Sequence, residues 1–83
     1  MTNTHNLSGS CLCESIRFEI VEPMRDVIFC HCTQCRKSSG HFVAATAVDN
    51  KGFRLLQDNS LEWYKSSEEA ERGFCKLCGS SLF

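Results

Sequence analysis

The sequence lacks the features that place a protein in a membrane, outside the cell or on a nucleic acid. No apolar run among its 83 residues approaches the ~20 residues that a membrane-spanning helix needs. The segment MTNTHNLSGS at the N-terminus has neither the basic nor the apolar region of a secretory signal. Nine basic and ten acidic side chains give a net charge of −1, without the basic excess of a nucleic-acid-binding domain. These absences predict a cytoplasmic protein with neither a membrane nor a nucleic acid as its partner.

Several catalytic and metal-binding signatures are also missing. The sequence contains no HExxH motif and no pair of histidines at the spacing of a C2H2 finger. It lacks the His-x-Glu of the zinc deaminases. A glycine-rich phosphate loop and a GxSxG motif are absent too. The patterns therefore exclude zincins, C2H2 fingers, zinc deaminases, P-loop proteins and serine hydrolases of the GxSxG type.

Cysteine is abundant, with seven in the chain. A domain of this length buries only about 60% of the surface that its unfolded chain exposes, so it usually needs disulfides, a metal or a partner subunit. Disulfides are rare in a reducing cytoplasm, and an odd number of cysteines would leave one thiol unpaired. Metal ligation, with zinc as the metal, is therefore the favoured interpretation. The cysteines form three clusters: Cys11-Leu12-Cys13, Cys30-His31-Cys32-Thr33-Gln34-Cys35 and Cys75-Lys76-Leu77-Cys78.

The spacings suit metal ligation. Residues i and i+2 of an extended segment face the same side, and a C-x2-C pair needs a turn, for which Gly79 can supply a positive φ. A structural zinc normally has four protein ligands, whereas a catalytic zinc has three and an open position. We expect two zinc ions per chain. The expected structural ligands are Cys11, Cys13, Cys75 and Cys78. The expected ligands of the second, open site are Cys30, Cys32 and Cys35. Spacing alone leaves a zinc ribbon open as an alternative, formed by Cys32, Cys35, Cys75 and Cys78.

Polar residues directly after the central cysteine cluster are candidates for substrate binding. Arg36 and Lys37 are cationic, and Ser38 and Ser39 offer hydroxyl groups that could hold a small carboxylate. A solvated loop is the alternative interpretation of the same residues. His31 lies between two cysteines of an extended segment, so we expect its side chain to point away from the metal.

The remaining pattern predicts a mainly β protein with a single domain over residues 8–83, after a disordered tail over residues 1–7. Residues 15–21 alternate between apolar and polar, which is typical of a half-buried strand. Residues 42–48 are apolar on both faces and predict a buried central strand. We expect Trp63 and Tyr64 in the core, and no long helix. Further short strands are predicted at 53–56 and 61–65. Residues 27–29 are a short apolar run that leads into the central cysteine cluster, and residues 72–75 lead into the last cysteine pair.

Three segments resemble the glutathione-dependent formaldehyde-activating enzyme family, also called the CENP-V/GFA domain: SGSCLC (8–13), CHCTQCRKSSGHFVAATAV (30–48) and LEWYKSSEEAERGFCKLCGSSLF (61–83). The resemblance implies a zinc-stapled Mss4-like, or β-tent, fold and supports the division of the cysteines into four structural and three substrate-facing ligands. It also implies a carbon–sulfur lyase, in which the thiolate of glutathione attacks formaldehyde to give S-hydroxymethylglutathione.

The chain departs from the family pattern at two places. Glu14 stands where the family usually has glycine, which predicts strain in that turn. The family domain normally continues with further strands beyond the position of Phe83. Two interpretations follow: a truncated chain, or a homo-oligomer in which the C-terminal edge pairs with another copy. The alternative to an enzyme is a non-catalytic, zinc-stabilised module that binds a thiol or a partner protein.

Overall fold

The computed structural model describes residues 7–83, and most of its regular elements are β-strands, as predicted. The expected tail over residues 1–7, with His5, lies outside the described residues except for Leu7, which begins β1. The elements are β1 (Leu7–Ser10), β2 (Ile16–Ile20), β3 (Ile28–Cys30), α1 (Thr33–Ser39), β4 (Val43–Ala45), the 3-10 helix η1 (Asn50–Gly52), β5 (Phe53–Asp58), β6 (Leu61–Lys65) and β7 (Glu71–Cys75).

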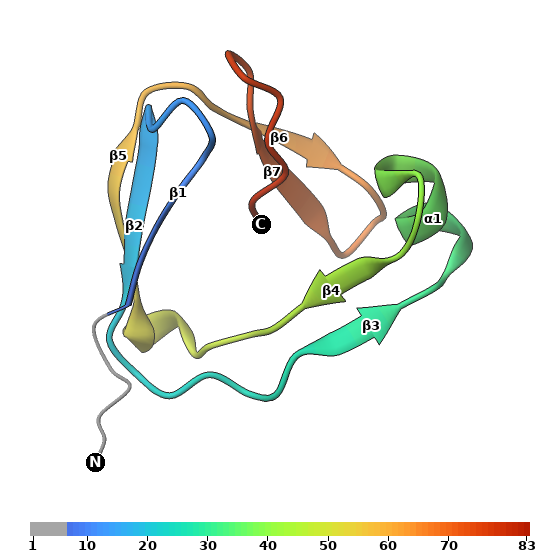
Figure 1. Cartoon of the computed structure of the whole chain (residues 1–83), viewed down its shortest axis with the longest axis horizontal. Coiled ribbons are helices and arrows are strands. Elements are labelled where there is room, and N and C mark those ends of the chain that lie inside the picture. The colour runs from blue at the N-terminus through green and yellow to red at the C-terminus, as the bar shows by residue number, and fades with distance from the viewer. Residues whose placement is uncertain (1–6) are drawn as a thin grey trace.

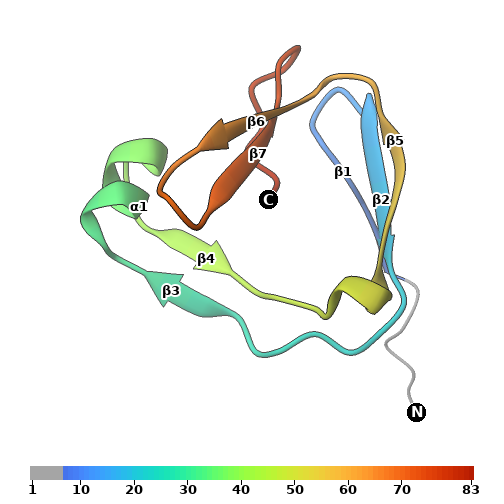
Figure 2. The same cartoon turned by 180° about the vertical axis from the view of Figure 1, so that it is seen from behind.

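The strands form three small antiparallel sheets. β2 lies between β1 and β5 in a three-stranded sheet, while β3 pairs with β4 and β6 pairs with β7. Figures 1 and 2 show these sheets and α1 arranged around the middle of the molecule, with the β6–β7 turn next to α1. The 3-residue pairing of β3 with β4 and the short α1 bring the central cysteine cluster to one side of this arrangement.

β2 forms as its alternating pattern predicts. Ile16 and Ile20 are buried, and Phe18 on the same face is half-buried. The ring of Phe18 packs against Phe53 at 5.6 Å and against Phe83 at 5.2 Å between ring centroids. This aromatic cluster joins the three-stranded sheet to the last described residues of the chain.

Two predictions about buried residues are wrong. The segment 42–48 is not a central strand, because only Val43–Ala45 is extended and it pairs with β3 alone. The two alanines of β4 carry little apolar surface, so burying both faces of the β3–β4 sheet would add little stability. Trp63 and Tyr64 are 50% and 61% exposed, since the β6–β7 sheet also has only two strands. Helix α1 (TQCRKSS) was not predicted from the sequence, because it is short and has no apolar stripe.

The core is small and rich in sulfur. Among the described residues, the buried apolar side chains are Cys11, Ile16, Ile20, Cys35 and Cys75. Cys11, Ile16 and Cys75 form one cluster, against which Phe83 and other half-buried residues pack. Because most of these side chains are thiols, apolar burial alone supplies little stability to this fold. In the part of the chain that the structure describes, no helix has the length and apolar character needed to cross a membrane.

The turn that follows the first two cysteines contains a strained residue, as predicted. Glu14 has a φ of 66°, in the left-handed region that disfavours side chains with a Cβ atom. Its amide donates to Cys11 O at 3.1 Å, and its carboxylate forms an exposed ion pair with Arg17 at 2.6 Å. An exposed pair of this kind contributes little to stability, so the backbone conformation dominates the effect of a substitution here.

Replacing Glu14 with glycine is expected to raise the free energy of unfolding by up to about 1 kcal/mol, because relief of the left-handed strain exceeds the added flexibility of the unfolded chain. Urea unfolding of the metal-loaded protein measures this difference. Glu14→Ala is the matched control, since it removes the ion pair with Arg17 and keeps the strain. Equal stability of the glycine and alanine variants would contradict the prediction.

Candidate metal centres

Four cysteine sulfurs converge where the first and last cysteine clusters meet. Their ligand atoms all lie within 4.8 Å of one another. The Cys13 sulfur is 3.7 Å from both the Cys11 and the Cys75 sulfurs. Four thiols at this separation could hold a metal ion, and four cysteine sulfurs are a common donor set of tetrahedral structural zinc. We call this set the four-cysteine group: Cys11, Cys13, Cys75 and Cys78.

A turn after β7 positions two members of this group. The amide of Cys78 donates to the Cys75 sulfur at 3.4 Å. Gly79 has a φ of 82° and donates its N–H to Cys75 O at 2.8 Å. The predicted positive φ at Gly79 is therefore confirmed, and it lets the chain reverse direction without a Cβ clash.

Hydrogen bonds favour the ionised form of Cys75. Burial on its own raises the pKa of this thiol, but hydrogen bonds from Ser15, Ser60 and the amides of Cys78 and Leu77 outweigh burial and lower the pKa to about 5. Ser60 is itself buried, and its hydroxyl lies 3.2 Å from the Cys75 sulfur. Since metals bind the thiolate and not the thiol, this environment prepares Cys75 to be a ligand.

The three other cysteines form a second cluster where β3 ends and α1 begins. Cys30 ends β3, Cys32 caps the N-terminus of α1, and Cys35 lies in the first turn of α1. Their sulfurs also lie within 4.8 Å of one another. We call this set the three-cysteine group: Cys30, Cys32 and Cys35.

The backbone around Cys32 and Cys35 repeats the hydrogen bond that is seen between Cys75 and Cys78. The amide of Cys35 donates to the Cys32 sulfur at 3.2 Å. Gly40, with a φ of 82°, ends α1 by donating its N–H to Arg36 O at 2.8 Å. Both C-x2-C motifs thus use an N–H···S hydrogen bond to hold their two sulfurs on one side of the turn.

The three-cysteine group is open on one side. Cys35 is buried, whereas Cys32 is exposed. Hydrogen bonding from Cys35 lowers the pKa of Cys32 to about 7, and the same contact, together with Cys30 and burial, raises the pKa of Cys35 to about 11. The exposed thiol of the pair therefore ionises first. Three donors leave one tetrahedral position for a further ligand, which is the pattern of a catalytic zinc site.

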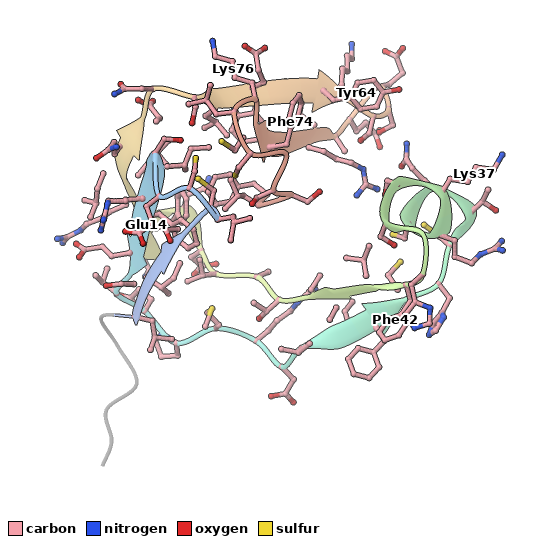
Figure 3. The ribbon with its side chains drawn as sticks, turned by 45° about the horizontal axis from the view of Figure 1, so that its top comes forward. Glu14, Lys37, Phe42, Tyr64, Phe74 and Lys76 are labelled. Carbon is pink, nitrogen blue, oxygen red and sulfur yellow. The ribbon has the colours of Figure 1, made fainter. Side chains whose placement is uncertain are left out.

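The alternative grouping into a zinc ribbon is not formed among residues 7–83, where the thiols separate into the groups of four and three. Within the same described range, neither His31 nor His41 belongs to either group. The ring of His31 stacks on Phe42, with 5.0 Å between centroids, and His41 lies 4.4 Å from the same ring. The Phe42 side chain lies outside the β3–β4 ribbon in Figure 3.

The candidate substrate residues differ in where they lie. Arg36 is held locally, donating from Nε to His31 O at 3.0 Å, and Figure 3 shows Lys37 pointing away from α1 into solvent. Ser38 and Ser39 line a cavity of about 810 Å³, and Ser39 Oγ donates to Cys35 O at 2.7 Å. Among the described residues, this cavity is lined by the two serines but by neither Arg36 nor Lys37.

The cavity has a mostly apolar lining drawn from all three sheets, including Phe18, Trp63 and Phe83. Its charged lining residue is Arg72 of β7, which was not among the residues predicted from the sequence to form a site. Arg72 donates to Gln34 Oε1 at 3.0 Å, and its guanidinium group partly opposes the rise in the pKa of the Cys35 thiol. No local motif marks this arginine, because only the folding of β7 beside α1 brings it to the three-cysteine group.

These features define a small, mainly β protein with two clusters of cysteines, the four-cysteine group and the three-cysteine group, each able to hold a metal ion. Residues 6–83 match the family described as glutathione-dependent formaldehyde-activating enzyme, and the chain belongs to this family. An uncharacterized lyase of Schizosaccharomyces pombe is 33% identical to it over 76 residues, which cover 90% of this chain and 54% of the relative. The chain thus spans about half the length of that relative. No solved structure matches the chain.

Proposed function

We propose that this protein is a zinc-dependent carbon–sulfur lyase that acts on the adduct of glutathione with an aldehyde, formaldehyde in the reaction that names its family. The family match and the lyase name of its relative support this class of reaction. The observation that carries the proposal is the three-cysteine group, with its buried Cys35, its exposed Cys32 and its missing fourth donor. A site that only held the fold together would be expected to have four ligands.

Zinc fits both the four-cysteine group and the three-cysteine group. Each group contains only soft sulfur donors, and these sulfurs lie within 4.8 Å of one another. We therefore propose two zinc ions per chain, a structural one in the four-cysteine group and a second one in the three-cysteine group. When bound in the second group, zinc supplies a positive charge that favours the ionised form of a neighbouring thiol.

The chain's own residues then bind and orient the reactants. In the direction of synthesis, the thiol of glutathione loses its proton, its sulfur forms a bond to the carbonyl carbon, and the carbonyl oxygen takes up a proton. The reverse direction breaks the same carbon–sulfur bond. We propose that Ser38 and Ser39 bind polar groups of glutathione at the cavity, and that Arg36 and Lys37 attract its carboxylates from the exposed side of α1.

Zinc-loaded protein is expected to accelerate the exchange between formaldehyde, glutathione and S-hydroxymethylglutathione above its uncatalysed rate. NMR exchange spectroscopy measures this rate directly at equilibrium. The same protein after removal of its metal by a chelator is the control, and should give the uncatalysed rate. If loaded protein at increasing concentration leaves the exchange rate unchanged, the proposed reaction is rejected.

A non-catalytic binding module is the second candidate, and the exposed apolar surface favours it. The consecutive residues Val27, Ile28 and Phe29 are 59%, 49% and 64% exposed, and a contiguous exposed apolar patch is typical of an interaction site. In that case the three-cysteine group would bind a thiol or a partner without turnover. Binding of glutathione together with an unchanged exchange rate is the result that would favour this candidate.

A further inference from the structure

Arg72 contains a buried polar atom that its surroundings do not satisfy. Within residues 7–83, its Nε is the only buried side-chain nitrogen or oxygen that has no hydrogen-bond partner of good geometry. Leaving a buried donor unpaired costs about 1–3 kcal/mol, and more for a charged group. Such an atom in a folded protein calls for a functional or structural reason.

The guanidinium group is held in place from the side of α1. Its second terminal nitrogen donates to Gln34 Oε1 at 3.0 Å, and Gln34 Nε2 donates to Ser66 O at 2.9 Å. Gln34 thus ties α1 to the β6–β7 turn, in agreement with their proximity in Figures 1 and 2. Because Gln34 directly precedes Cys35, this tie places the arginine beside the three-cysteine group.

No carboxylate neutralises this cation in the part of the chain that is described, since none of the ion pairs there includes Arg72. A buried or half-buried charge normally has a partner of opposite sign. Arg72 is instead close enough to the buried Cys35 to favour the ionised form of that thiol, and it lines the same cavity as Ser38 and Ser39, which follow Cys35 in α1. Arg36 and Lys37 do not take this place, because the former is bound to His31 O and the latter points into solvent.

The three-cysteine group needs such a cation once it is ionised. A divalent metal on three thiolates carries one net negative charge, and an ionised thiol as fourth ligand adds another. Negative charge in a partly buried site is unfavourable unless a positive group lies close to it. A guanidinium is suited to this role, because it stays protonated and offers several N–H donors in a fixed plane.

We propose that Arg72 is a positioning residue of the three-cysteine group: its unpartnered Nε–H is available to the Cys35 sulfur once the group holds a metal, and its charge offsets that of the ionised thiols. This inference rests on the proposed metal site of that group. It predicts that Arg72 strengthens metal binding there and leaves the four-cysteine group unaffected.

Titration with Co(II), followed by its thiolate charge-transfer absorption in competition with a chelator, tests the inference without any assay of activity. Arg72→Gln is expected to weaken Co(II) binding at the weaker of the two sites by about 10- to 100-fold, the usual effect of removing a group that supports a metal ligand. Arg72→Lys, which keeps the charge without the planar donors, should recover part of this affinity. The stronger site should be unchanged in both variants, which also shows that they fold.

Two control variants separate charge from structure. Arg54→Gln removes an exposed cation that pairs with Glu19 on a distant sheet, and should leave both sites unchanged. Gln34→Ala removes the hydrogen bonds of Gln34 with Arg72 and with Ser66 O but keeps the arginine. It should therefore lower the Co(II) affinity of the three-cysteine group less than Arg72→Gln does. Two results would overturn the inference but leave the proposed metal site standing. One is an equal loss of Co(II) affinity in Gln34→Ala and Arg72→Gln, with no recovery in Arg72→Lys. The other is no loss of Co(II) affinity in Arg72→Gln. A single Co(II) ion on the wild-type protein would overturn the proposed metal site and the inference together.

Discussion

Cys11→Ser is expected to unfold the protein. Cys11 is only 3% exposed and belongs to the small cluster with Ile16 and Cys75 that forms the centre of the core. The Ile16 amide also donates to its sulfur at 3.4 Å. Structural zinc contributes about 10–16 kcal/mol in small zinc domains, which equals or exceeds the whole stability of a typical domain. Loss of one ligand of the four-cysteine group should therefore remove most of the free energy of unfolding.

Circular dichroism and elemental analysis of the same sample measure both consequences. We expect loss of the β-sheet signal together with loss of bound zinc. Leu12→Ser is the matched control, because Leu12 lies between the two cysteines and is 82% exposed. The backbone N–H of residue 12 donates a hydrogen bond to Ser80 Oγ at 3.0 Å, and this hydrogen bond does not depend on the side chain that is replaced. A Cys11→Ser protein that is soluble, folded and fully loaded with zinc would refute the structural role of the four-cysteine group.

Cys30→Ser is expected to have the opposite balance of effects, with a large loss of activity and little loss of structure. Cys30 ends a three-residue strand and is only half-buried, so its removal leaves the central core intact. A serine hydroxyl does not ionise at neutral pH and is a poor zinc ligand. Since even supporting residues of metal sites change activity by about 10- to 100-fold, loss of a direct ligand should reduce the catalysed exchange by at least about 100-fold.

Elemental analysis should find one zinc ion in the Cys30→Ser chain where the parent chain has two, with nearly the same temperature of unfolding. Thr33→Ser is a suitable control, since it alters a neighbouring exposed residue and keeps the hydroxyl that accepts from Arg36 at 3.4 Å. Full exchange activity in Cys30→Ser protein would separate the reaction from the three-cysteine group and favour the non-catalytic module.

The grouping of the thiols was the most predictable feature of this molecule, because it depends on short spacings. Cys-x-Cys and Cys-x2-Cys segments bring their own sulfurs together almost regardless of the rest of the fold. The turn at Gly79 was predictable from its local sequence, whereas the strain at Glu14 was predictable from the glycine that the family usually has at this position. What spacing left open was which clusters meet, and the pairing of β6 with β7 decides this, since it places Cys75 opposite Leu61 and away from α1.

Features that depend on neighbouring layers could not be predicted from the sequence. The apolar pattern of residues 42–48 and of Trp63 indicates burial, but small two-stranded sheets leave such residues partly exposed. Helix α1 is short and polar, and it forms where Cys32 and Gly40 provide its caps. Arg72 lies far from the central cysteines in the sequence, and only the tertiary structure brings it to Cys35.

The sequence separation of the ligands has a consequence for how the protein is made. Cys13 and Cys75, whose sulfurs meet in the four-cysteine group, are 62 residues apart, whereas the three-cysteine group lies within one short segment. Ribosomes deliver the chain from its N-terminus at about 5–20 residues per second, and contacts between distant residues form slowly. With the proposed metal sites, the three-cysteine group could therefore bind an ion on the nascent chain, whereas the four-cysteine group could bind one only after Cys75 and Cys78 emerge. The supply of zinc at that later moment should set the yield of folded protein.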